Sequence, residues 1–174
     1  MPLLKGEKII LRAMEPADAD ILYEWENNPE IWRVSHTVTP FSKALLKTFI
    51  EVAAKDIYTN KQLRLMIEEQ KTGITIGTID LFDFDPIHQR AGIGILIDTK
   101  YRNQGFAHDT IKVIKEYAFH VLLLHQLYCN ILEDNIESRK LFTNEGFVLV
   151  GNKKEWIKTE NGFKNELLLQ CIIS

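Results

Sequence analysis

Apolar positions along the chain repeat with two spacings, which divide it into strands and helices. Steps of two, or short apolar runs bounded by turn residues, predict seven strands, at 7–14, 62–69, 74–84, 88–97, 126–132, 147–158 and 163–173. Steps of three and four predict helices over 16–25, 42–55 and 104–122, and a short one that Asp134 or Asn135 caps and Gly146 ends. Asn27, Asn28 and Pro29 are expected to end the first helix.

The order of these elements predicts an α/β protein of the α+β type. Strands that follow one another directly favour antiparallel neighbours, whereas the strand, helix and strand within 88–132 predict one parallel crossover. We therefore expect a mixed, mostly antiparallel sheet of six to seven strands flanked by helices. No repeat, linker or low-complexity tract divides the 174 residues, so the sequence predicts a single domain, 1–174.

Residues 98–109, DTKYRNQGFAHD, join a predicted strand directly to a predicted helix. The first amides of a helix have no partners within it, and the helix dipole favours an anion such as a phosphate there. Gly105 permits close approach of the backbone, Ala107 leaves the first turn open, and Arg102 can add a charge-assisted contact. On composition alone, an ordinary solvated loop is the simpler interpretation. Neither G-x-x-x-x-G-K-[ST] nor G-x-G-x-x-G occurs, which argues against a P-loop or a Rossmann site.

The strand before this junction, AGIGILI, has one bulky face and one nearly bare face. Gly92 and Gly94 share a face with Leu96, whereas the isoleucines at 93, 95 and 97 take the other. Glycine inside a strand often marks a bulge or the close approach of another group. The bare face therefore either lines a ligand channel or receives a neighbouring helix.

The net charge restricts the possible binding partners, and the cysteine content indicates the cellular compartment. A formal net charge of -3 and a pI near 6.0 argue against a nucleic-acid or anionic-membrane binder. The two cysteines, Cys129 and Cys171, lack metal-ligand spacing and imply no disulfide framework, which favours a reducing cytoplasm. No signal segment or membrane span is expected, and no two histidines have metal-site spacing, so we predict a cytoplasmic protein without a metal.

Four motifs in register then point to a known family. The strand GIGILID leads into residues 102–107, RNQGFA, which fit the loop pattern [QR]-x-x-G-x-[GA]. Downstream, residues 135–138, NIES, and residues 141–147, LFTNEGF, are similar to N-x-x-[AS] and L-Y-x-x-x-G-F. With these motifs and its element order, nearly the whole chain resembles the GNAT superfamily of acetyl-CoA-dependent N-acetyltransferases. FDPIHQRAGIG is similar to the corresponding segment of the ribosomal-protein N-terminal and spermidine acetyltransferase branches.

The resemblance implies that the protein moves an acetyl group from acetyl-CoA to a primary amine by direct attack in a ternary complex. Amides of the loop and first helical turn would bind the pyrophosphate, the strand would pair with the pantetheine, and one strand N–H would stabilise the oxyanion. Asn135 would hold the pantetheine from the other side and also suits a helix cap. The implied cofactor-binding residues are Ile95, Leu96, Ile97, Arg102, Asn103, Gln104, Gly105, Phe106, Ala107, His108, Asn135, Ser138 and Phe142.

The sequence departs from the family pattern where acid–base chemistry is expected. Many relatives have a tyrosine at position 142 and a glutamate at position 92, where this chain has Phe142 and Gly92. Ser138, one turn before Phe142, is a candidate proton donor, or an ordinary residue of the helix start. Asp80 is a candidate base or amine anchor with a raised pKa, or a solvated carboxylate at a strand end.

The acceptor is expected to be a peptide N-terminus or small amine in preference to a polyamine. Spermidine enzymes carry acidic residues before a Pro-aromatic pair, whereas this chain has Val38-Thr39-Pro40-Phe41, although Asp80 and Asp83 keep some acidity. The losses at positions 142 and 92 leave one alternative open, a catalytically impaired CoA-binding regulatory module. Relatives form dimers and larger rings, so the resemblance also leaves a homo-oligomer open.

Overall fold

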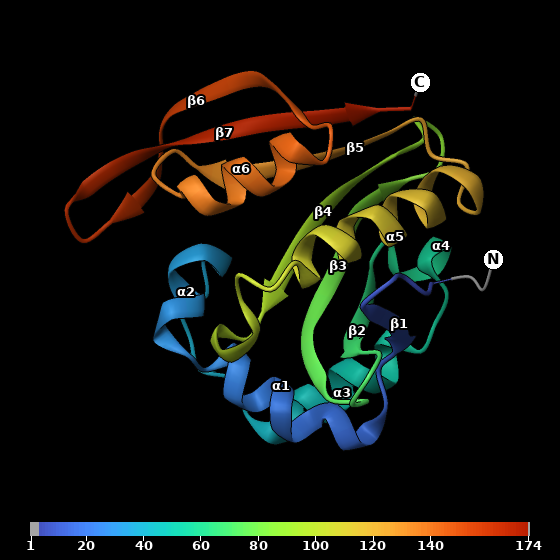
Figure 1. Ribbon diagram of the computed structural model, residues 1–174. Coiled ribbons are helices and arrows are strands. Elements are labelled where there is room, and N and C mark those ends of the chain that lie inside the picture. The colour runs from blue at the N-terminus through green and yellow to red at the C-terminus, as the bar shows by residue number, and fades with distance from the viewer. Residues whose placement is uncertain (1–3, 174) are drawn as a thin grey trace.

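One mixed sheet of seven strands runs through the protein in the order β1-β2-β3-β4-β5-β7-β6 (Figure 1). The computed structural model describes residues 4–173; residues 1–3 and 174 of the predicted domain 1–174 lie outside the described residues. The strands are β1 (Ile9–Ala13), β2 (Leu63–Glu69), β3 (Thr75–Asp85), β4 (Arg90–Ile97), β5 (Gln126–Leu132), β6 (Val148–Thr159) and β7 (Gly162–Ile172). The helices are η1 (Pro16–Asp18), α1 (Ala19–Glu26), α2 (Pro29–Ser35), α3 (Lys43–Ala53), α4 (Ile57–Asn60), η2 (Thr99–Tyr101), α5 (Phe106–His120) and α6 (Ile136–Asn144).

The pairing of the strands confirms the predicted fold class. Every neighbouring pair is antiparallel except β4 and β5, which are parallel and are connected through α5. This is the one crossover expected between residues 88 and 132. Because α5 lies between these two strands in the chain, its first turn lies beside the point where β4 ends.

Two apolar clusters cover the two faces of the sheet, as alternation along the strands requires. On β2, Leu65 and Ile67 belong to the larger cluster, which α5 completes with Ile111 and Ile114. Met66, between them, belongs to the second cluster, which α1, α2 and α3 form. Figure 1 shows α5 across one face and α1 and α3 at the opposite side of the strands. The face toward α1 and α3 is called the α1–α3 face below.

Two helices differ from the sequence prediction. The Asn27-Asn28-Pro29 stretch, expected to end a helix, also begins α2, because the Asn28 side chain accepts a hydrogen bond from the Glu30 amide and Pro29 takes the first helical position. The short α4 was not predicted; it begins where the Asp56 carboxylate accepts from the Thr59 amide. The two short helices belong to different layers: Ile31 of α2 packs in the cluster of α1 and α3, whereas Ile57 of α4 packs in the larger cluster with α5.

Candidate active site

The parallel strands β4 and β5 pair over only three positions and then separate. Their register joins Arg90 to Gln126, Ala91 to Leu127 and Gly92 to Tyr128. Beyond Gly92, β4 still pairs with β3, and beyond Tyr128, β5 still pairs with β7. Figure 1 shows β4 and β5 together at the upper right and spread apart toward the left. The fork between residues 93–97 and 129–132 therefore exposes two inner strand edges, and the predicted residues Ile95, Leu96 and Ile97 form one of them.

The loop at the open end of the fork presents free backbone amides. Asn103 and Gly105 both have positive φ, 59° and 82°, which turns the chain sharply into α5. Among residues 4–173, no backbone acceptor is bonded to the amides of residues 103–108. Gly105 is the N-cap of α5 and supplies no side-chain cap. These amides and the dipole of a 15-residue helix provide an anion site at the position that the sequence predicted.

Side chains of the loop take several different directions. The Arg102 Nε donates to the Ile97 carbonyl at 3.0 Å, which fixes the guanidinium beside the end of β4. Phe106 is buried in the larger cluster, so only its backbone faces the loop. The His108 Nδ1 lies 2.8 Å from the Glu145 Oε1, so this ring points toward the end of α6. Lys115 also donates to the Glu145 carbonyl at 2.5 Å, and together these contacts join α5 to α6 across the fork.

The segment before β1 holds the loop from behind, a feature that the sequence did not reveal. The Asp109 carboxylate accepts from the amides of Glu7, Lys8 and Ile9 at 3.2, 2.7 and 3.1 Å. The Lys8 Nζ donates to the Gln104 carbonyl at 2.8 Å. We call these four bonds the clasp. Its partners lie about 100 positions apart in the chain, so no local pattern could have indicated it.

On the other side of the fork, α6 carries the remaining predicted cofactor residues. The Asn135 side chain accepts from the Ser138 amide at 3.2 Å, which confirms the capping role of Asn135. The Ser138 side chain is half-buried, and its hydroxyl has no hydrogen-bond partner within the described residues. Phe142 is buried and meets Phe147 edge to face at 5.1 Å, so it belongs to the apolar core. Of these side chains, only Ser138 offers a proton.

Asp80 on β3, the candidate base or amine anchor, is bonded to a guanidinium. The Arg64 Nε donates to Asp80 Oδ1 at 2.6 Å, and its NH2 donates to Oδ2 at 3.1 Å. The Arg64 NH1 donates to Glu26 Oε1 at 2.6 Å, so one guanidinium joins β2, β3 and the end of α1. Arg64 stands directly opposite Asp80 in the β2–β3 register, which only the sheet pairing reveals. Asp80 therefore lies on the α1–α3 face with both of its oxygens engaged.

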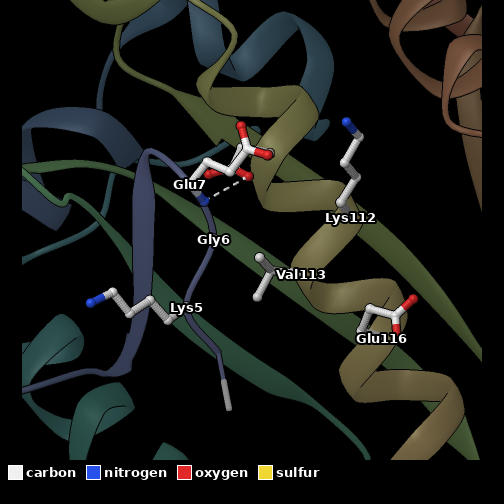
Figure 2. Close-up of a pocket in the computed structure, with 7 residues that line it drawn as sticks. Lys5, Gly6, Glu7, Lys112, Val113 and Glu116 are labelled. Atoms are coloured by element: carbon white, nitrogen blue, oxygen red, sulfur yellow. Dashed lines mark hydrogen bonds between the residues drawn. The ribbon is translucent and has the colours of Figure 1, made fainter. Parts of the chain in front are cut away.

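One cavity lies away from the fork. It has a volume of about 450 Å³ and opens between the segment before β1 and the outer side of α5 (Figure 2). It is lined by Lys5, Gly6, Glu7, Asp109, Lys112, Val113 and Glu116. None of the predicted cofactor or catalytic residues is among them. The free strand edges and free amides therefore make the fork the candidate active site.

Two further observations bear on the predicted absences. Within residues 4–173, no three His, Cys, Asp or Glu side chains gather in a way that could hold a metal ion. None of the helices in the described part of the chain is both long and apolar enough to cross a bilayer.

Comparison with known proteins agrees with this geometry. Residues 8–148 match the family described as the acetyltransferase (GNAT) domain. The spermidine N(1)-acetyltransferase of Vibrio cholerae is 27% identical over 150 residues, which cover 86% of this chain and 84% of the relative. An uncharacterized N-acetyltransferase of Bacillus subtilis, YoaA, is also 27% identical, with 90% and 88% covered.

The fold is also that of solved members of this group. The crystal structure of a Vibrio cholerae spermidine N-acetyltransferase with CoA and spermine superposes with a TM-score of 0.86, covering 96% of each chain at 24% identity. Both chains thus share the seven-stranded sheet arrangement described above. The sequence match, the forked sheet and the amide-rich loop together place this chain in the GNAT family of acetyl-CoA-dependent N-acetyltransferases.

Proposed function

We propose that the acceptor of the acetyl group is a cationic primary amine, and specifically a polyamine of the spermidine class. The observation that carries the proposal is the excess of carboxylates on the α1–α3 face beside the fork. Glu26 and Asp80 share one guanidinium, that of Arg64, so two negative charges against one positive charge leave one uncompensated. Asp83, three residues along the chain from Asp80, forms no ion pair within residues 4–173. Two relatives named spermidine N(1)-acetyltransferases, from Vibrio cholerae and Escherichia coli, support the same class.

In this proposal the two sides of the fork bind different parts of acetyl-CoA. The loop at residues 102–107, with His108, would hold the pyrophosphate of acetyl-CoA through backbone amides and the Arg102 guanidinium. Residues Ile95–Ile97 would pair with the pantetheine as an added strand, and a β4 amide would bind the oxyanion. Asn135 and Ser138 would approach the pantetheine from α6, and the buried Phe142 ring would support them from beneath.

Direct transfer requires three proton movements. The ammonium of the acceptor first loses one proton to solvent, and its nitrogen then forms a bond to the thioester carbon. The nitrogen loses a second proton to solvent as the tetrahedral intermediate collapses and the carbon–sulfur bond breaks. The departing thiolate takes a proton, for which we propose the Ser138 hydroxyl, which is half-buried on α6. Asp80 is proposed as an electrostatic anchor for the acceptor, because the Arg64 guanidinium engages both of its oxygens.

Binding of the cofactor is tested by thermal unfolding with acetyl-CoA, CoA, ATP and NADH. A ligand that binds only the folded state adds about 2.7 kcal/mol of stability at a hundred times its Kd. We expect acetyl-CoA and CoA to raise the Tm and the other two to leave it unchanged. An equal shift with ATP or NADH would argue against a dedicated CoA site.

The acceptor class is tested by thiol release with spermidine, a peptide with a free N-terminus and a monoamine. We expect spermidine to give the highest kcat/KM. A peptide that surpasses it would overturn the polyamine proposal and restore the preference drawn from the sequence. Binding of acetyl-CoA without thiol release from any amine would favour the CoA-binding regulatory module.

The role of Ser138 is tested by Ser138→Ala. The cap of α6 uses the Ser138 amide rather than its hydroxyl, so the substitution is expected to leave stability unchanged. Loss of a general acid lowers kcat by about a hundredfold or more. Asn135→Ala is the matched variant: it removes the cap and is expected to lower stability by about 1 kcal/mol. An unchanged kcat in Ser138→Ala would remove Ser138 from the mechanism.

Assembly is a separate proposal. A spermidine N-acetyltransferase of Vibrio cholerae has been solved as a dodecamer. We propose a homo-oligomer for this chain as well, which light scattering of the purified protein would test.

A further inference from the structure

The Phe82 ring lies where a side chain at position 92 would be. An ideal Cβ on Gly92 would stand only 2.2 Å from the nearest carbon of this ring, whereas one on Gly94 would stand 3.8 Å from it. Position 92 is therefore a glycine because an aromatic ring from β3 covers it. The nearly bare face of β4 receives this ring at Gly92, rather than the helix or open channel that the sequence suggested.

A second ring continues the same surface across the fork. Tyr128 pairs with Gly92 in the last register position before β4 and β5 separate. Its ring meets Phe82 edge to face, with centroids 6.0 Å apart and an interplanar angle of 85°. Both rings are only partly buried. Burial, and next the nearby Asp83 carboxylate, raise the pKa of Tyr128, so the phenol stays neutral at physiological pH.

Asp83 adds a negative charge that no other described residue neutralises. It lies at the irregularity in the β3–β4 register, with φ of 48°, and it is exposed. Asp80 pairs with Arg64, and Asp85 lies 3.4 Å from Arg90, the nearest guanidinium on β4. Within residues 4–173, by contrast, Asp83 forms no ion pair.

We propose that Phe82, Tyr128 and Asp83 together bind the alkylammonium end of the acceptor and determine its class. Perpendicular rings offer a π surface to a cation and apolar contact to its methylene groups, and the carboxylate supplies the opposite charge. Phe82 and Tyr128 stand at the vertex of the fork on the α1–α3 face, where Asp80 lies two positions before Phe82 on β3. Asp83 lies near the Tyr128 phenol. This inference rests on the proposed function and assigns residues to it.

The test compares acceptor kinetics in four variants of the full chain. Tyr128→Leu removes the ring, and its KM for spermidine is expected to rise about 2- to 30-fold, the range of a cation–π contact. Asp83→Asn removes the charge at constant size, with an expected rise of about two- to fivefold. The KM for acetyl-CoA is expected to stay unchanged in both. Tyr58→Leu, which removes an exposed ring that meets the buried Phe84 edge to face, and Glu116→Gln, an exposed carboxylate on α5, are the matched controls.

Calorimetric titration of spermidine into the CoA-loaded protein separates this inference from the proposed function. Turnover by the wild type with unchanged acceptor KM in Tyr128→Leu and Asp83→Asn would overturn the inference and leave the function standing. Amine binding that Asp83→Asn weakens, without any turnover, would support the inference and overturn the function. The absence of both turnover and amine binding would overturn the inference and the proposed function. An equal rise of the spermidine KM in the control variants would show a general effect of stability or charge. That outcome would also overturn the inference.

Discussion

At the scale of single residues, aromatic contacts occupy the two positions where the family resemblance suggests a glutamate and a tyrosine. The Phe82 ring lies where a side chain on Gly92 would be. The Phe142 ring packs against Phe147. Neither position therefore supplies an ionisable group to the fork.

The coupling at Gly92 is testable by stability measurements. Gly92→Ala forces its new methyl group into the Phe82 ring and is expected to lower the free energy of unfolding by about 1–3 kcal/mol. Gly94→Ala is the control, because its methyl group would make an ordinary contact at 3.8 Å. In a Phe82→Ala background the effect of Gly92→Ala is expected to shrink. Urea unfolding of the wild type, the two single variants Gly92→Ala and Phe82→Ala and the double variant gives the coupling free energy between the two positions. Additive effects of the two substitutions would show that the Phe82 ring moves aside at little cost.

At the scale of elements, the start of α5 depends on a strand that lies far away in the sequence. The helix begins without a side-chain cap, and the clasp from residues 7–9 holds its first turn and the loop before it. The ammonium of Lys8 also stands close to Gly105, 2.9 Å from where a Cβ would be. β1 thereby contributes both geometry and positive charge to the anion site.

The substitution Lys8→Met tests what the Lys8 ammonium contributes to the anion site. The substitution keeps the length of the side chain but removes its charge and its bond to the Gln104 carbonyl. We expect the KM for acetyl-CoA to rise about two- to tenfold, in line with a charge-assisted contact, while the acceptor KM stays the same. Lys112→Met, on the outer side of α5, is the control. A shift of both KM values in Lys8→Met would indicate a general structural effect instead.

At the scale of the whole molecule, Arg12 adds charged contacts between the sheet and the helices of the α1–α3 face. Its guanidinium donates to both Asp18 oxygens at 2.8 Å and also contacts Glu68, so it connects β1, β2 and the start of α1. Burial of Asp18 opposes its ionisation, but the Arg12 bonds and the Glu15 amide outweigh burial and lower the pKa of Asp18. The ion pair therefore adds a stability that depends on pH.

The direction of that dependence follows from the lowered pKa. A carboxyl group whose pKa is lower when folded stabilises the protein above its unfolded pKa of about 3.9, and this contribution is lost as the pH falls through the folded value. Asp18→Asn is expected to be less stable than the wild type at pH 7, with the difference shrinking below about pH 4. Urea unfolding at both pH values measures it. An equal difference at both values would show that charge plays no part.

Local sequence patterns predict much of this structure, but contacts between distant segments could not be predicted from them. The strands and the 102–107 loop could be predicted because alternation, glycine placement and the motif lie within short windows. The ion pairs of Arg64 and the hydrogen bonds of the clasp could not be predicted, because their partners come together only when the strands pair. The start of α2 was missed because Asn-Pro suits both a helix end and a helix start. Phe82 over Gly92 required the β3–β4 register, which a single sequence does not supply.

The fork also changes how many edges the sheet has. An open sheet normally has two, here β1 and β6, but the separation of β4 from β5 creates two more in the middle. Edges with free amides and carbonyls recruit any extended chain, which is the usual origin of strand-mediated aggregation. The feature that suits the fork to a strand-like pantetheine thus also leaves backbone unpaired in the middle of the sheet, and we expect bound acetyl-CoA to cover these edges as well as to react there.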